Sequence, residues 1–304
     1  MVSGVVDFML NKKINILIST YNGEKYIGQQ IESILSQSYQ NFHIFVRDDC
    51  SSDKTVQIVS TYINTGKVTL YADENIGFSQ SFMKLLLLAD TGDFWAFCDQ
   101  DDVWLPDKLL WALEWMESQD MSLPCLFHSA FENVDADLKH LSYYTPPKYK
   151  NSFQRTLTEC RYFGFSMVIN STLRELMLRG DPQHIVSHDW WAQLIAVAFG
   201  KCEFDSRIAS KHRRHLNSIT LDNNKNKMKW LKNSIKERNI IANNAEEFET
   251  LFAENLSSKD RKLLHQFTQK KFGDNLMRAF YSKRWRPSLL SEVALRGLML
   301  FGKS

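Results

Sequence analysis

The sequence lacks the features of a disulfide-rich, a zinc-binding or a membrane-spanning protein. Its five cysteines are scattered and lack CxxC spacing, which argues against a disulfide framework or a zinc site and favours free thiols in a reducing cytosol. No uninterrupted apolar run is long enough to span a bilayer, and no signal stretch stands at the N-terminus. The first strand-to-helix turn lacks the G-x-G-x-x-G pattern of dinucleotide-binding folds. These absences predict a cytoplasmic protein.

The chain does contain enough apolar sequence for a sizeable core, and its charge is unevenly distributed. Its 304 residues, 44% of them hydrophobic, suit one large domain or a domain with an appendage. The net charge is only +2, but residues 1–210 hold 17 Lys/Arg and 26 Asp/Glu, whereas residues 211–304 hold 20 and 9. A basic C-terminal third predicts an anionic partner such as lipid headgroups, phosphates or nucleic acid. The alternative is a basic helical surface with no partner.

The first hundred residues alternate between short apolar segments and helical patterns. We expect strands at residues 14–19, 42–46, 68–71 and 94–98, with amphipathic helices between them. This spacing predicts right-handed βαβ units and a mostly parallel sheet flanked by helices. Polar residues follow successive strands, so they should gather along one rim, where open α/β sheets bind their ligands.

An acidic turn follows the fourth of these strands. The stretch Phe94–Trp104 begins as an apolar run and then places Asp99, Asp101 and Asp102 within four residues. Carboxylates this close repel one another unless a cation lies between them. A Mg²⁺ or Mn²⁺ ion that carries a phosphorylated ligand would meet that need, because hard oxygen ligands suit these ions. The alternative is a solvated acidic turn that caps the next helix.

Motifs at successive strand ends together resemble those of a known enzyme family. They are Ser19-Thr20-Tyr21-Asn22-Gly23, Asp48-Asp49-Cys50-Ser51-Ser52-Asp53-Lys54-Thr55, Asn75-Ile76-Gly77 and Asp99-Gln100-Asp101-Asp102. In this order they resemble the family 2 inverting glycosyltransferases of the GT-A fold. A later His188-Asp189-Trp190-Trp191 resembles the bacterial rhamnosyltransferase-like branch. The resemblance covers residues 13–220 and implies a Rossmann-like α/β fold with a helical C-terminal extension.

The resemblance implies a donor site for a nucleotide-diphosphate sugar. Tyr21 offers a stacking surface for the nucleoside, and Asp48 or Asp49 accepts the imide N–H of uracil or thymine. Asp99 faces the ribose, and Asp101 binds Mn²⁺ or Mg²⁺ at the diphosphate. The residues expected to bind the donor nucleotide are Thr20, Tyr21, Asn22, Glu24, Asp48, Asp49, Asn75, Gly77, Asp99 and Gln100. The alternatives are strand-end packing for Tyr21 and turn or cap chemistry for the two aspartates.

The later motifs imply the acceptor side and the catalytic base. We expect Asp189 to be that base, although its place at the head of a helix also suits a cap. The segment Lys211–Ser218 resembles the family's YRxHxxN segment, which makes His215 a metal ligand beside Asp101 and Asp99; the register leaves His212 as an alternative. The residues expected at the diphosphate or the acceptor are Arg213, Arg214, Trp104, His188, Trp190 and Trp191.

The last third of the chain has a helical pattern. We expect a catalytic domain over residues 1–220 and a helical region over residues 221–304. The final segment, from Pro287, is amphipathic and follows a basic stretch, so it could lie in a membrane interface. Packing against the catalytic domain or against a second subunit, in a homodimer, is the alternative.

These features predict a metal-dependent inverting glycosyltransferase. From the resemblance alone the donor is dTDP-L-rhamnose, with a UDP-hexose or UDP-galactofuranose as the alternative. The acceptor is a hydroxyl of a growing cell-surface polysaccharide on a polyprenyl-diphosphate lipid, so we expect peripheral contact with the anionic inner face of the membrane, and no nucleic acid. A DxD phosphatase does not fit, because its nucleophilic aspartate should end the first strand. A non-catalytic nucleotide-sugar-binding protein explains neither the acids nor Asp189.

Overall fold

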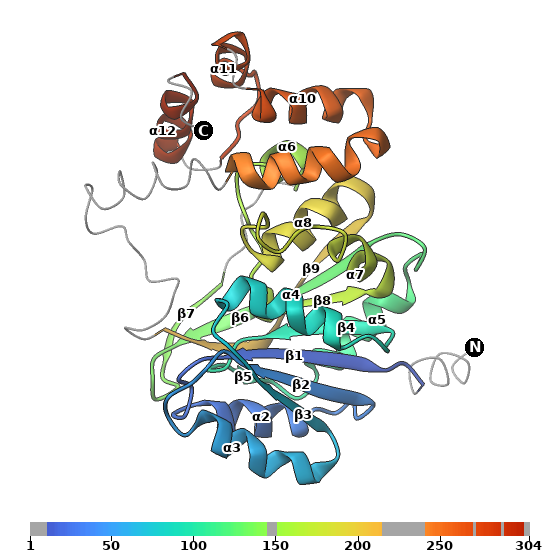
Figure 1. The fold of residues 1–304 in the computed structure, drawn as a ribbon, viewed down its shortest axis with the longest axis vertical. Helices are drawn as coiled ribbons and strands as arrows, with labels where there is room; N and C mark the ends of the chain where they lie inside the picture. Colours follow the sequence, from blue (N-terminus) through green and yellow to red (C-terminus); the bar gives the residue numbers. More distant parts are fainter. Residues whose placement is uncertain (1–10, 145–150, 215–240, 270–271, 287–288, 301–304) are drawn as a thin grey trace.

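One large sheet organises the fold in the computed structural model, which describes residues 11–144, 151–214, 241–269, 272–286 and 289–300 (Figure 1). Within these residues the sheet has nine strands in the order β3-β2-β1-β4-β8-β6-β9-β5, and β7 pairs with β6. Helices cover both faces of the sheet, with α2 and α3 on one side and α4, α7 and α8 on the other (Figure 1). This confirms the predicted α/β class.

The first half of the sheet is the predicted parallel array. Its strands are β1 (Ile14–Thr20), β2 (Phe42–Asp48), β3 (Val68–Ala72) and β4 (Phe94–Cys98). They are connected by α2 (Ile27–Leu35), α3 (Thr55–Tyr62) with η1 (Ile63–Thr65), and α4 (Phe78–Leu88). Neighbouring strands of this half run parallel. Their carboxyl ends therefore meet along one edge, which carries all four of the early motifs.

The second half brings in antiparallel strands. Its elements are β5 (Val103–Trp104), α5 (Lys108–Glu117), β6 (Cys125–Val134), β7 (His140–Tyr143), α6 (Phe153–Thr156), η2 (Gly164–Ser166), β8 (Met167–Asn170), α7 (Ser171–Met177), α8 (His188–Phe199) and β9 (Lys201–Arg213). β8 runs antiparallel to both β4 and β6, and β5 runs antiparallel to β9. Four of the eight strand pairings in the described part of the chain are parallel, so the sheet is mixed.

Alternation along the strands builds a hydrophobic core on each face. In β1, Ile14, Ile16 and Ile18 join the cluster under α2, α3 and α5, whereas Leu17 joins the cluster under α4, α7 and α8. Successive side chains of a strand point to opposite faces, so a strand buried on both sides is apolar throughout. This is why the strands read as continuous apolar runs in the sequence.

The C-terminal helices continue the core on the α8 side. They comprise residues 241–252, η4 (Ala253–Asn255), α10 (Ser258–Thr268), α11 (Phe272–Ala279) and α12 (Leu289–Leu300). Phe248 packs against Trp191 of α8 at 5.7 Å between ring centroids, and Trp285 belongs to the same cluster. The buried sides of these helices therefore pack on the sheet domain, while the predicted boundary at residues 220/221 lies outside the described residues. None of the helices described here is both long and apolar enough to cross a bilayer.

Candidate active site

The loop after β1 is fastened to the loop after β4 by the amide of Gln100. Its Oε1 accepts hydrogen bonds from the Thr20 hydroxyl at 2.6 Å and the Tyr21 amide at 2.9 Å, and its Nε2 donates to the Tyr21 carbonyl at 3.2 Å. Gly23 is required beside this amide, because a Cβ there would lie 2.4 Å from Gln100 Oε1. The Tyr21 ring remains 51% exposed, as a stacking surface for a base must be.

Two more of the residues expected at the donor shape this loop through contacts with the chain. Asn22 has a positive φ of 49°, and its Oδ1 accepts from the Ser52 amide at 2.9 Å. Glu24 Oε2 accepts from the Lys54 amide at 3.0 Å. Both side chains tie the β1 loop to the approach of α3.

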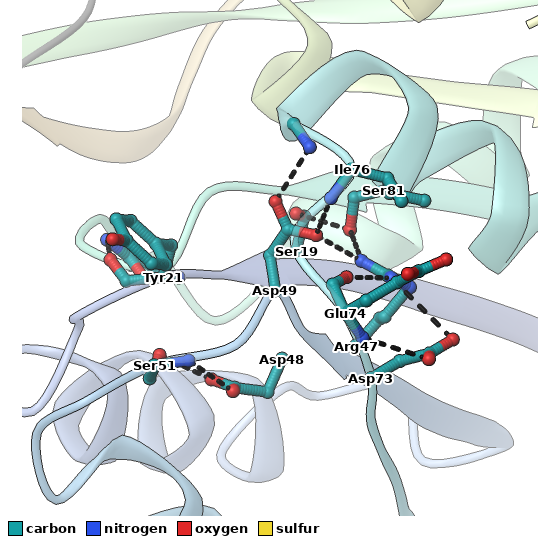
Figure 2. Close-up of polar contacts among 12 residues, drawn as sticks. Ser19, Tyr21, Arg47, Asp48, Asp49, Ser51, Asp73, Glu74, Ile76 and Ser81 are labelled. Atoms are coloured by element: carbon teal, nitrogen blue, oxygen red, sulfur yellow. Dashed lines mark hydrogen bonds and ion pairs between the residues drawn. The ribbon is translucent and has the colours of Figure 1, made fainter.

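Asp49 connects β2 to the turn that opens α4 (Figure 2). Its Oδ1 accepts from Arg47 Nη1 at 2.5 Å and from the Ile76 amide at 2.9 Å, and its Oδ2 accepts from the Gly77 amide at 2.9 Å. Arg47 is only 1% exposed, so this is a buried ion pair with further hydrogen bonds on both partners. Asp49 thereby holds the turn containing Asn75 and Gly77 against the sheet.

The neighbouring Asp48 is engaged differently. Its two carboxylate oxygens accept from the amide and the hydroxyl of Ser51, at 2.8 and 2.5 Å. A carboxylate has room for about four hydrogen bonds, so Asp48 retains acceptor capacity. Of the two aspartates, Asp48 is therefore the better candidate for contacting a base.

Strand register brings a second group of acids together with a histidine. β5 pairs antiparallel with β9, and Val103 lies opposite Lys211. Asp102 and His212 each lie one residue beyond this pair, and Asp102 Oδ1 is 2.9 Å from His212 Nδ1. One ligand atom from each of Asp99, Asp102 and His212 lies within 4.8 Å of the others. We call these three residues the acid–histidine group.

The charges of the acid–histidine group act strongly on one another. Burial, followed by the charges of Asp102 and Asp101, raises the pKa of Asp99 well above its usual value. Burial lowers the pKa of His212, but the charge of Asp102 and the hydrogen bond to it outweigh burial and raise that pKa overall. Asp102 Oδ2 is buried and has no hydrogen-bond partner among the described residues. An unsatisfied carboxylate oxygen beside a second acid and an imidazole fits a divalent cation such as Mn²⁺ or Mg²⁺.

The membership of this group differs from the set expected from sequence. Its histidine is His212, and His215 lies outside the described residues. Its second acid is Asp102, while Asp101 acts on the group through its charge. Phe165 of η2 stacks on the His212 ring with 4.4 Å between centroids and 7° between planes. The imidazole is thus oriented by a hydrogen bond to Asp102 and by an aromatic face.

Asp189 lies in the first turn of α8, two residues after the N-cap Ser187. Its Oδ1 accepts from the Ser187 hydroxyl and from the Trp190 amide, the latter at 2.8 Å. The Ser187 side chain makes no capping hydrogen bond to the helix backbone, so its hydroxyl serves Asp189 instead. Burial is the main cause of the raised pKa of Asp99, and the charge of Asp189 is the smallest one. Asp189 is therefore an oriented first-turn carboxylate whose charge acts on the acid–histidine group.

The aromatic residues expected at the diphosphate or acceptor lie in the core instead. They are Trp104, His188, Trp190 and Trp191. The indole N–H groups of Trp190 and Trp191 donate to backbone carbonyls, which is how buried tryptophans satisfy their polar end. His188 lies between Phe82 and Phe97, at 4.1 and 4.7 Å between centroids, and burial lowers its pKa to about 4. All four are therefore buried side chains and not exposed ligand contacts in this structure.

Of the two arginines expected at the diphosphate, Arg213 has a guanidinium that contacts the protein itself, whereas Arg214 is placed by its backbone. The buried guanidinium of Arg213 lies 4.6 Å from the ring centroid of Tyr26 and donates to Gln29. Its backbone amide donates to Asp102 Oδ1 at 3.2 Å, so Arg213 also supports the acid–histidine group. The backbone amide of Arg214 donates to the Val134 carbonyl at 2.8 Å.

Lys108 is a residue of this region that the sequence analysis does not identify. It is fully buried, its Nζ donates to the Phe165 carbonyl at 3.1 Å, and the same atom lies 4.8 Å from the Trp104 ring centroid. Burial lowers its pKa to about 8, against the opposing charges of Cys98 and Asp102. The sequence does contain a sign of this burial. Lys108 lies one turn before Ala112 on the buried face of α5, and a charged group that is buried there requires partners.

The chain is similar to known sugar transferases in sequence and in fold. Residues 15–177, more than half of the chain, match the model of "Glycosyl transferase family 2". The dTDP-rhamnosyl transferase RfbG of Shigella flexneri is 27% identical over 222 residues, which cover 66% of this chain and 72% of the relative. The matched part of this chain covers 64%, 44% and 21% of the length of three other curated relatives.

Two solved structures share the fold at 16% identity. S. aureus TarS 1-349 in complex with UDP has a TM-score of 0.59, covering 89% of this chain and 75% of that one. The mannosyltransferase PcManGT from Pyrobaculum calidifontis, in complex with GDP-Man and Mn²⁺, has a TM-score of 0.52, covering 95% and 74%. The predicted GT-A fold is confirmed. The chain belongs to glycosyl transferase family 2.

Proposed function

We propose that this protein is a divalent-cation-dependent, inverting glycosyltransferase that uses a nucleotide-diphosphate sugar. The observation that carries the proposal is the acid–histidine group, which gathers two acids from the turn after β4 and a histidine of β9. Its three side chains form a donor set for a cation, and the charge of Asp189 acts on Asp99. Family membership supports sugar transfer.

Asp99, Asp102 and His212 would hold the cation, with Asp101 adjacent. When bound, a divalent ion neutralises negative charge that develops on the diphosphate leaving group. The hydrogen bond that the ring donates to Asp102 and the stack on Phe165 orient the His212 ring for such a role. PcManGT holds Mn²⁺ together with GDP-Man, which supports Mn²⁺ or Mg²⁺ here.

Tyr21 and Asp48 would receive the nucleoside of the donor. The exposed Tyr21 ring stacks on the base, and Asp48 accepts its imide N–H, a contact that suits thymine and uracil alike. Gln100 keeps the two loops of this pocket together. We propose dTDP-L-rhamnose as the donor, because RfbG is named a dTDP-rhamnosyl transferase. A UDP-sugar is the alternative, supported by TarS in complex with UDP.

Asp189 would act as the general base. It removes the proton from an acceptor hydroxyl, whose oxygen attacks the anomeric carbon from the face opposite the diphosphate. The new C–O bond forms as the bond to the diphosphate breaks, so the anomeric configuration inverts. The Ser187 hydroxyl and the Trp190 amide hold the Asp189 carboxylate in place in the first turn of α8.

The acceptor we propose is a saccharide on a polyprenyl-diphosphate lipid. Such an acceptor requires peripheral contact with the inner face of the membrane, and residues 1–220 would form the catalytic domain beside a helical region over residues 221–304. A homodimer is the other arrangement that the C-terminal helices allow.

A thermal-shift panel tests the nucleotide part of the proposal. dTDP, UDP, GDP and ADP would each be added with Mn²⁺, with Mg²⁺ or with EDTA. We expect dTDP or UDP to raise the melting temperature with a divalent ion and to do so far less with EDTA, because ligands that bind only the folded state stabilise it. If none of the four nucleotides stabilises the protein with either ion, the proposal is wrong.

A further inference from the structure

A pocket of about 350 Å³ lies among α6, α10 and the segment between α11 and α12. In Figure 1, α6 and α10 lie on the opposite side of the sheet from α2 and α3. Four of the residues that line the pocket are cationic and one is acidic: Arg155, Lys259, Lys283 and Arg284, with Asp260. We call this the basic pocket. An excess of positive charge in a concave site favours an anionic ligand.

Buried polar contacts fix the wall of the basic pocket. The carboxylate of Glu292, itself buried, accepts from the amides of Trp285 and Arg286 at 3.0 and 2.8 Å. The side chain of Gln154 donates to the Arg284 carbonyl at 2.9 Å. The fully buried Trp285 anchors the same segment. Because the backbone that carries two of the cations is held in place, binding a ligand has to order the exposed cationic side chains but not this part of the main chain.

The single acid of the pocket is engaged with the start of α10. Asp260 Oδ2 accepts from the Ser257 hydroxyl at 2.8 Å, and the Asp260 amide donates back to the same hydroxyl oxygen at 3.1 Å. This capping arrangement also directs the positive end of the α10 dipole toward the pocket side. The cations of the basic pocket thus remain in excess, and a phosphate group is a ligand of matching charge and size.

Exposed apolar side chains lie on or next to the two helices that flank the Tyr281–Arg284 segment of the basic pocket. Of the eleven large apolar side chains that are exposed in the described part of the chain, five fall within residues 277–300. They are Met277, Phe280, Leu289, Val293 and Leu300. The last three share one face of α12, since helical residues four and seven positions apart lie on the same side. Phe280 directly precedes Tyr281, which lines the pocket. We call these five side chains the apolar face.

We propose that the basic pocket and the apolar face together bind an anionic membrane lipid, with the phosphate headgroup in the pocket and the apolar side chains at the acyl-chain boundary. The proposal names a lipid-binding site for the membrane contact that the proposed acceptor requires, but the site itself would exist whether or not the chain transfers sugar. A surface that pairs cations with exposed apolar groups has the two attractions by which proteins lie on an anionic bilayer. A second copy of the chain fits this surface less well than a lipid does, because a two-fold contact would bring the cationic residues of both copies together.

Vesicle sedimentation of the full chain tests this site. We expect binding to vesicles of phosphatidylcholine with phosphatidylglycerol, weaker binding at higher salt, and little binding to phosphatidylcholine alone. Lys259→Gln together with Lys283→Gln should weaken binding roughly 25-fold, since one basic residue near an anionic surface contributes about fivefold. Phe280→Ser with Val293→Ser should also weaken it. The matched control is Lys84→Gln with Leu87→Ser, an exposed pair on α4 that should bind as the wild type does.

Two sets of results would overturn the proposal, and competition with phosphate would support it. Equal binding to neutral and anionic vesicles, or unchanged binding of the lysine double variant, would overturn it. A wild-type dimer that Phe280→Ser converts to monomer, without vesicle binding, would make the apolar face a subunit interface instead. Millimolar inorganic phosphate should compete with the vesicles for the wild type and leave the residual binding of the lysine variant unchanged. Stabilisation by dTDP or UDP should be the same in every variant, so failure of the lipid site and failure of the proposed function are distinguishable.

Discussion

Replacing Asp102 by asparagine changes one atom at the centre of the acid–histidine group. Oδ1 of Asp102 accepts from the His212 ring and from the Arg213 amide, and an asparagine oxygen can keep both bonds. The buried Oδ2, which has no partner among the described residues, becomes an NH₂ group that cannot bind a cation. We therefore expect Asp102→Asn to fold and to lose most of its affinity for a divalent ion.

The size of the effect follows from linkage between binding and unfolding. With Mn²⁺ and nucleotide at 100 times their dissociation constant, the wild type gains about 2.7 kcal/mol of unfolding free energy. If the variant binds ~100-fold more weakly, its gain at the same concentrations is about 0.4 kcal/mol. An unfolding entropy of about 2.1 cal/mol/K per residue gives roughly 0.6 kcal/mol/K for this chain. The melting temperature should thus rise by roughly 4 °C in the wild type and by less than about 1 °C in Asp102→Asn.

Differential scanning fluorimetry with Mn²⁺ and dTDP or UDP, against the same samples with EDTA, measures both shifts. Asp90→Asn, a change at an exposed acid away from the site, is the control and should keep the wild-type shift. Asp101→Asn is the informative comparison, because Asp101 stands outside the group of three. A wild-type shift in Asp102→Asn together with a lost shift in Asp101→Asn would refute the reasoning from the structure and restore the assignment from sequence.

Three further predictions concern the base, the pH dependence and the core. Asp189→Asn should slow sugar transfer ~10²–10⁴-fold while dTDP or UDP stabilises it as before; near wild-type transfer would reduce Asp189 to a helix cap. Buried His188 has a folded pKa of about 4, below its ordinary 6.5, so the unfolded state binds more protons and stability falls as the pH drops through this window. Urea titrations at pH 7.5 and 4.5 measure the unfolding free energy at both ends of this interval. The decrease between them should be ~2–3 kcal/mol smaller in His188→Leu than in the wild type; an equal decrease would show that His188 does not cause the pH dependence. Trp285→Ala should cost ~3–5 kcal/mol of unfolding free energy, because it empties a fully buried site against Phe267, whereas exposed Phe280→Ala should cost little; calorimetry that finds less than ~1 kcal/mol for Trp285→Ala would contradict a shared core.

The parallel half of the sheet could be predicted because its signals are local. The alternating faces of β1 and the polar residues that follow Thr20, Asp48 and Cys98 are visible in short windows of sequence. Parallel strands then place those residues on one edge without further information. The loops after β1, β2 and β4 lie along this edge for the same reason, since each follows the carboxyl end of a parallel strand.

The composition of the acid–histidine group could not be predicted in this way. It depends on the pairing of β5 with β9, and β5 has only two residues, too few for any periodic pattern. The resemblance to family motifs identified the acidic turn but left the histidine between His212 and His215. The partners of Asp49 could not be predicted either. Nothing in the sequence distinguishes Arg47 from other strand residues, and its contacts with Asp49 and with the turn before α4 form only in the folded chain.

Asp102 and His212 are 110 residues apart along the chain. During synthesis, Asp102 is therefore made well before its histidine partner. The nucleotide-facing edge is complete once β4 has emerged, but its three clustered acids must wait for β9. At roughly 5–20 residues per second of translation, that interval is about 5–20 s. Until then the acids repel one another with no imidazole beside them, so the turn after β4 should be the last part of the edge to gain protection from hydrogen exchange. The docking of β9 thus completes at one moment both the far side of the sheet and the acid–histidine group.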